Sequence, residues 1–141
     1  MFEAVLYAGI ADVLASLARD YTLLVATSKA QVLAEPILAH FELDRHFAAI
    51  HGAELDGRRD DKGELIAHIL AVRDIDPSAV IMVGDRKYDV AGAARNGIAT
   101  IGVLWGHGSE AELREAGAVA LCRRPDDLPL MAAEHFRAVR R

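Results

Sequence analysis

The chain has 141 residues, of which 52% are hydrophobic, and a formal net charge of -5 at pH 7. This length and apolar content suit one globular domain with a buried core, so we expect a single domain over residues 1–141. The acidic balance argues against a nucleic-acid partner, since such proteins usually carry a basic surface. With no membrane-length apolar run and no signal-peptide pattern in residues 1–10, we expect a soluble cytoplasmic protein without a membrane partner.

Strand-like and helix-like segments alternate along the chain. Short apolar runs predict strands, at residues 2–7, 21–26, 48–51, 79–83, 98–104 and 119–122. Apolar residues at helical spacing predict helices, at residues 10–20, 32–41, 62–73, 90–96, 109–116 and 126–140. Because short loops join these segments in strand–helix order, we expect an α/β fold with three α/β/α layers around a doubly wound parallel sheet. The single cysteine, Cys122, excludes an intrachain disulfide and is expected in the core.

The predicted strand at 79–83 leads into a pair of aspartates. Five consecutive apolar residues predict a fully buried strand, which Gly84 ends, and Asp85 and Asp89 follow. Ligands of open α/β sheets gather outside the carboxyl ends of the strands, and two carboxylates there suit Mg²⁺. The structural alternative is that Asp85 caps the next helix while Asp89 favours its first turn.

Two further groups are predicted at the same edge of the sheet. Thr27 and Ser28 follow the second predicted strand, where hydroxyls and backbone amides can hold a phosphate oxygen. Both residue types are also common helix caps, which is the alternative. Lys62 opens a helix, where its positive charge opposes the macrodipole. One explanation for a lysine at this place is that its ammonium neutralises a phosphate. The alternative is a solvated lysine paired with Asp60 or Asp61.

Other polar residues near this edge have two interpretations each. His107 follows the strand at 98–104 and either touches a ligand or shapes the loop; we favour the loop. Arg86 and Lys87 either meet a phosphate or balance the acidic pair. Trp105 is expected to pack rather than to recognise a ligand. The remaining five histidines share no metal-ligand spacing.

Together these residues resemble the motifs of the haloacid dehalogenase superfamily, in its phosphoglycolate-phosphatase-like and 5′-nucleotidase-like branch. Thr27 with Ser28, then Lys62, and then Gly84-Asp85-x-x-x-Asp89 look like its motifs II, III and IV. The resemblance runs from about residue 7 to about residue 128. It implies a Rossmann-like core and a Mg²⁺-dependent phosphatase, a hydrolase that acts on a small phosphorylated metabolite of the phosphoglycolate or nucleotide type.

The resemblance also implies a role for each matching residue. Thr27, Ser28 and Lys62 would bind the phosphate, and Lys62 and Asp85 would take part in catalysis. Asp85 would bind Mg²⁺, and Asp89 would support the metal site from behind it.

The sequence departs from the family at its first motif, D-x-D-G-T. Ala8 and Ile10 stand where the nucleophile and the general acid/base should follow the first strand. Tyr7-Ala8-Gly9-Ile10 instead resembles the segment that normally follows the cap domain, so we expect a core without a cap. Neither side chain can attack phosphorus, so we expect weak Mg²⁺ binding and impaired or absent phosphatase activity.

Three interpretations therefore stand. The first is a phosphatase core, probed by its Mg²⁺-dependent turnover. The second is a non-catalytic remnant or fragment that binds phosphate, metal or a protein partner. The third, a phospho-accepting receiver domain, is disfavoured because Tyr7-Ala8 offers no acidic pair after the first strand. Loss of a cap would uncover apolar surface, so a homodimer is also expected.

Overall fold

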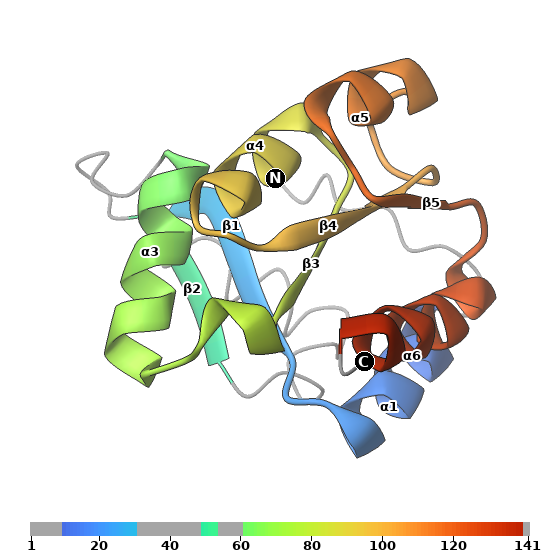
Figure 1. Cartoon of the computed structure of the whole chain (residues 1–141), viewed down its shortest axis with the longest axis horizontal. Coiled ribbons are helices and arrows are strands. Elements are labelled where there is room, and N and C mark those ends of the chain that lie inside the picture. The colour runs from blue at the N-terminus through green and yellow to red at the C-terminus, as the bar shows by residue number, and fades with distance from the viewer. Residues whose placement is uncertain (1–9, 31–48, 54–60, 140–141) are drawn as a thin grey trace.

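The computed structural model describes residues 10–30, 49–53 and 61–139 (Figure 1). The predicted strand at 2–7 and the predicted helix at 32–41 lie outside these ranges. The described helices are α1 (Ile10–Asp20), α3 (Lys62–Arg73), α4 (Lys87–Arg95), α5 (Glu110–Ala116) and α6 (Leu128–Val139). None of these described helices is long and apolar enough to cross a membrane.

The described strands all pair in parallel. They are β1 (Leu24–Ala30), β2 (Ala49–Ala53), β3 (Ile81–Gly84), β4 (Ala99–Val103) and β5 (Ala120–Cys122). One ladder joins β1 to β2, and a second has the order β3-β4-β5. In the second ladder Ile81 pairs with Ala99, and Ile101 pairs with Ala120. Parallel pairing with intervening helices is what the alternating pattern predicted.

Helices cover both faces of the β3-β4-β5 sheet. On one face, Val13 and Leu17 of α1 pack with Ile101 of β4 and with Leu128 and Ala132 of α6. A separate cluster joins Ile66 of α3, Ala93 of α4 and Ile98. Figure 1 shows α1 and α6 side by side, away from α3, α4 and α5. The predicted three-layer α/β/α architecture is therefore confirmed.

Several predicted boundaries shift for local reasons. The strand expected at 21–26 begins at Leu24, because the Tyr21 N–H donates to the Leu17 carbonyl and prolongs the end of α1. It then continues to Ala30, past the predicted end. The helix expected from residue 90 begins at Lys87. By contrast, the predicted helix at 62–73 and the Ser109 cap of α5 are confirmed.

The prediction of a fully buried strand at 79–83 is wrong. Ala79 belongs to a short 3-10 turn, η2 (Pro77–Ala79), and the strand itself starts at Ile81. Within it, Ile81 and Met82 are half-buried and Val83 is 40% exposed. The side chains of a strand project from its two faces, so their burial depends on what packs on each face and not on the apolar run alone. Cys122, in contrast, is fully buried as predicted.

Candidate functional site

Asp85 and Asp89 lie where β3 passes into α4. Asp89 is 8% exposed, and its Oδ2 accepts hydrogen bonds from the backbone N–H groups of Asp85 and Arg86, both at 3.1 Å. A Cβ on Gly84 would lie 2.7 Å from that same oxygen, so the turn requires glycine. Asp89, not Asp85, therefore satisfies the free N–H groups at the start of α4, and it brings the helix start forward to Lys87.

Lys62 connects this turn to β1. Its Nζ lies 2.9 Å from Asp89 Oδ1 and donates to the Ala26 carbonyl at 2.8 Å. The two side chains are only 10% and 11% exposed. Both carboxylate oxygens of Asp89 thus have partners, and the Lys62 charge is held against the main chain of β1 at Ala26. The alternative of a solvated lysine is wrong.

Asp61, the other partner considered for Lys62, has a different role. Its Oδ1 accepts from the Glu64 N–H at 3.0 Å and caps α3. The same carboxylate pairs with Arg95 Nη1 at 2.9 Å. The backbone hydrogen bond from Glu64, followed by the Arg95 contact, holds the pKa of Asp61 below its usual value. Lys62 is therefore left to face Asp89.

The loop after β4 wraps around Asp85. The backbone N–H of His107 donates to Asp85 Oδ2 at 3.0 Å. A Cβ on Gly106 would collide with the Asp85 side chain, and one on Gly108 would collide with the Asp85 carbonyl. His107 itself is exposed, so it acts here through its backbone and shapes the loop, which is the interpretation favoured from the sequence. The G-x-G spacing of Gly106 and Gly108 was the signal for this contact, and the sequence analysis did not use it.

Arg86 and Lys87 are held by a residue that the sequence analysis missed. Arg86 Nε lies 2.9 Å from Glu112 Oε2, and the Lys87 N–H donates to the same oxygen at 3.0 Å. The hydrogen bond from Arg86, and then the one from Lys87, hold the pKa of Glu112 below its usual value. Arg86 therefore balances Glu112 and ties α4 to α5. No local motif marks Glu112, because its partners come from another helix.

The main chain of Thr27 and Ser28 lies within β1. Thr27 pairs with Gly52 of β2, and the regular register breaks between Thr27 and Ala30. Lys62 donates to the carbonyl of Ala26, and Thr27 is the next residue along the strand. The structure thus brings the main chain at Thr27 together with Lys62, Asp85 and Asp89, while the contacts of the Thr27 and Ser28 side chains lie outside what it describes.

Asp85 is the better fit of the two aspartates to a Mg²⁺ ligand. Both oxygens of Asp89 are engaged, whereas among the described residues only Oδ2 of Asp85 receives a hydrogen bond. No group of three or more acidic, histidine or cysteine side chains in the described ranges is arranged to hold a metal ion. Mg²⁺ often uses one or two carboxylates and completes its shell with phosphate oxygens and water. Among the described residues, the Asp85 carboxylate could therefore serve as one ligand of such an ion.

Close packing of α3 on α4 fixes the position of Lys62. A Cβ on Gly92 would lie 2.8 Å from the Gly63 nitrogen and 2.9 Å from Lys62 Cγ, so the two backbones meet through glycines. Asn96 Nδ2 then donates to the Gly63 and Gly92 carbonyls, both at 2.9 Å. This contact sets the distance between the helix that carries Lys62 and the helix that carries Asp89.

Gly92→Ala is expected to lower the free energy of unfolding by about 1–3 kcal/mol, although alanine favours helix, because its methyl group would push backbone atoms apart. Urea unfolding measures the change. Gly63→Ala is the matched control: its methyl would meet the Arg95 guanidinium, whose side chain is 58% exposed and can swing away. We expect that variant to change stability by less than about 1 kcal/mol. Equal losses in both variants would contradict the assignment.

Known proteins resemble this chain in sequence and in fold. Residues 3–103 match a family model described as haloacid dehalogenase-like hydrolase. A 5′-nucleotidase of Pseudomonas aeruginosa is 50% identical over 81% of this chain and 52% of its own length. Tyrosine-protein kinase PtkA of Mycobacterium tuberculosis is 47% identical over 73% of this chain and 36% of its own. The crystal structure of a predicted phosphatase from Clostridium acetobutylicum superposes with a TM-score of 0.87 at 41% identity, covering 91% of this chain and 60% of that one.

The chain spans only part of the length of these relatives. It spans 52% of the length of the 5′-nucleotidase and 36% of that of PtkA. Phosphoglycolate phosphatases are similar as well, one from Chromobacterium violaceum at 32% identity over 49% of its length. About half of a typical curated relative therefore has no counterpart here.

Proposed function

The chain belongs to the haloacid dehalogenase-like hydrolase family, as its motifs predicted, and on that premise we propose that it is a phosphatase core that binds Mg²⁺ and a small phosphorylated metabolite. One observation carries the proposal. The Lys62 ammonium lies 2.9 Å from Asp89 Oδ1 and 2.8 Å from the Ala26 carbonyl. A buried cation thus lies between Asp89 and the main chain of β1, next to the two hydroxyl residues Thr27 and Ser28, which is where a phosphate would need it.

Each residue has a defined part in this proposal. Asp85 would hold Mg²⁺, which when bound neutralises charge on the phosphoryl oxygens. Thr27, Ser28 and Lys62 would hold the phosphate, with Lys62 stabilising its charge during transfer. Asp89 would keep the Lys62 ammonium in place and orient the turn that presents Asp85.

We further propose that this chain binds the phosphate better than it cleaves the ester. In the family an aspartate attacks phosphorus and a second aspartate moves the proton, but Ala8 and Ile10 occupy those places in the sequence. A methyl and a sec-butyl group have no lone pair for either step. What remains is binding and electrostatic stabilisation, which by themselves support only a small part of the rate of such an enzyme.

The purified chain is expected to bind Mg²⁺ and inorganic phosphate weakly and to hydrolyse p-nitrophenyl phosphate slowly or not at all. Calorimetry with each ligand and a colorimetric assay with Mg²⁺ or EDTA measure these properties. Asp85→Asn should abolish Mg²⁺ binding, and Lys62→Met should abolish phosphate binding. Asp126→Asn, in an exposed turn, is the control for both. Robust turnover that Asp85→Asn removes would overturn the impairment, and the absence of any phosphate binding would overturn the whole proposal.

A non-catalytic role is the second candidate, and Ala8 and Ile10 at the places of the family's two catalytic aspartates favour it. In that case the chain is a remnant or a fragment that binds phosphate, metal or a protein partner, such as a second copy of itself. The genomic reading frame and the intact mass of the natural protein distinguish the two. A D-x-D-G-T segment in the same polypeptide would favour the phosphatase, and light scattering tests the homodimer.

A further inference from the structure

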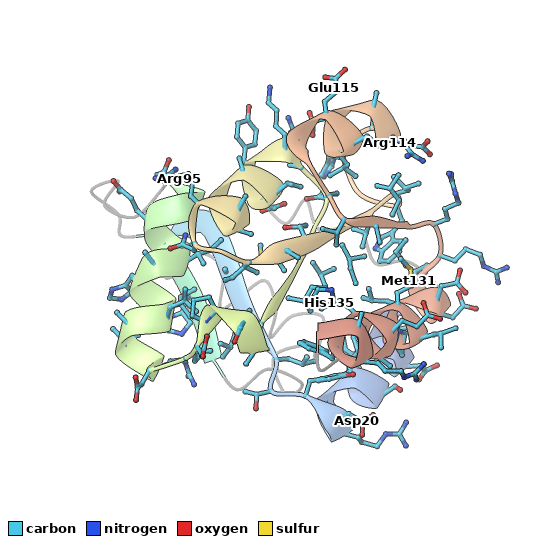
Figure 2. The ribbon with its side chains drawn as sticks, in the orientation of Figure 1. Asp20, Arg95, Arg114, Glu115, Met131 and His135 are labelled. Atoms are coloured by element: carbon cyan, nitrogen blue, oxygen red, sulfur yellow. The ribbon has the colours of Figure 1, made fainter. Side chains whose placement is uncertain are left out.

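A cavity of about 460 Å³ opens between the first turn of α3 and helix α4, beside the candidate phosphate site. Lys62, Tyr88 and Arg95 contribute to its lining. Lys62 thus borders the cavity, and its ammonium contacts Asp89 and the Ala26 carbonyl of β1. Figure 2 shows Arg95 at the end of α4, close to the N-terminal end of α3. The cavity is therefore adjacent to the phosphate that Lys62 is proposed to bind.

Backbone atoms form the floor of this cavity. Gly63 and Gly92 both line it, and side chains at these positions would meet Arg95 or Lys62 within 3 Å. Arg95 stands at one end, where its Nη1 contacts both carboxylate oxygens of Asp61 at 2.9 and 3.3 Å. That ion pair orients the planar guanidinium but occupies one of its three nitrogens. Among the described residues, Nε and Nη2 of Arg95 have no hydrogen-bond partner, and they can donate to a ligand group that accepts hydrogen bonds.

An exposed aromatic ring stands at the other end. Tyr88 is 57% exposed and lines the same cavity. Arg86 Cζ lies 5.2 Å and Lys87 Nζ 5.5 Å from its ring centroid. Because Arg86 is paired with Glu112, the Lys87 ammonium is the charge that favours an anionic ligand near the ring. Cation–π contacts at exposed sites are weak, whereas stacking of a flat aromatic group on an aromatic side chain is stronger, so a ligand ring can replace one of them.

From this arrangement we propose that the cavity binds the organic part of the phosphate ester and selects a flat aromatic group. The ring stacks on Tyr88, acceptor atoms on the ligand face Arg95, and the phosphate lies toward Lys62. The inference rests on the proposed phosphate site and adds to it the class of ester that the site prefers. A nucleotide base and a phosphotyrosine ring share this chemistry, so the test compares the two sources.

Two matched ligand pairs measure how much an aromatic ring on the ligand contributes to affinity. AMP differs from ribose 5-phosphate by an aromatic base, and phosphotyrosine differs from phosphoserine by an aromatic ring. Dissociation constants are measured by ligand-observed NMR with Mg²⁺ for the full chain, for Tyr88→Ala and for Tyr88→Phe. Leu130→Ala removes another exposed apolar side chain, on α6, and controls for nonspecific binding.

We expect at least one aromatic ligand to bind about 10-fold more tightly than its aliphatic partner, which corresponds to about 1.4 kcal/mol. Tyr88→Ala should remove this advantage, and Tyr88→Phe and Leu130→Ala should keep it. The pair that shows the advantage identifies the source. Equal affinities within both pairs, or an advantage that survives Tyr88→Ala, would overturn the proposal.

Inorganic phosphate, measured in the same way, separates this inference from the proposed function. If phosphate binds and the ring adds nothing, the aromatic site is wrong while the phosphate site stands. If neither phosphate nor any ester binds, both are wrong. Tyr88→Ala should leave the affinity for inorganic phosphate within about twofold, since Tyr88 contacts only the organic part.

Discussion

Asp89→Ala is expected to lower the free energy of unfolding by about 3–5 kcal/mol, because it removes one member of a buried ion pair. The Lys62 ammonium, 10% exposed, would lose the carboxylate that lies 2.9 Å away. The N–H groups of Asp85 and Arg86 would lose their acceptor as well. Unpaired buried donors cost more than the net gain of the bonds they make, so the loss should be a large fraction of the stability of a domain this size.

Urea unfolding of three variants tests this expectation. Asp126→Ala breaks an exposed contact with Arg124 at 3.4 Å and should change stability by less than about 0.5 kcal/mol. The double variant Lys62→Met/Asp89→Ala should be more stable than Asp89→Ala alone, since no buried charge is then left without a partner. A loss below about 1 kcal/mol for Asp89→Ala, or a double variant no more stable than Asp89→Ala, would show that the pair is effectively solvated.

A variant with D-x-D-G-T inserted after Leu6 is expected to hydrolyse p-nitrophenyl phosphate on the order of a thousandfold faster than the natural chain. The insertion supplies the nucleophile and the acid/base group that Ala8 and Ile10 cannot replace. It also offers a second carboxylate to a Mg²⁺ ion at Asp85, so Mg²⁺ affinity should rise in parallel.

An A-x-A-G-T insertion at the same place is the matched control, because it has the same length without the carboxylates. It should hydrolyse no faster than the natural chain. Adding Asp85→Asn to the D-x-D-G-T variant should remove the gain, since the metal ligand is lost. If both insertions fold, as judged by circular dichroism, and their rates are equal, then the missing motif is not what limits this chain.

Much of the fold followed from local pattern. The helical spacing at 62–73, the Ser109 cap and the alternation of strands and helices depend on residues that are close in sequence, and the structure has them as predicted. The strand at 79–83 did not follow. Its apolar run does not say which elements pack on each face of the strand, and Val83 is 40% exposed because side-chain burial depends on that packing.

The candidate site, like the fold, was predicted only in part from the sequence. By itself, the sequence determined which residue types occur in the motifs, and with them the family: hydroxyls at Thr27 and Ser28, the lysine at position 62 and two aspartates four residues apart. Only the tertiary structure decided how they pair. Lys62 faces Asp89 rather than Asp61, and the backbone of His107, not its ring, contacts Asp85. Such partners depend on how closely α3 packs on α4 and on where the loop after β4 returns, and these distances are set by contacts between elements far apart in the chain.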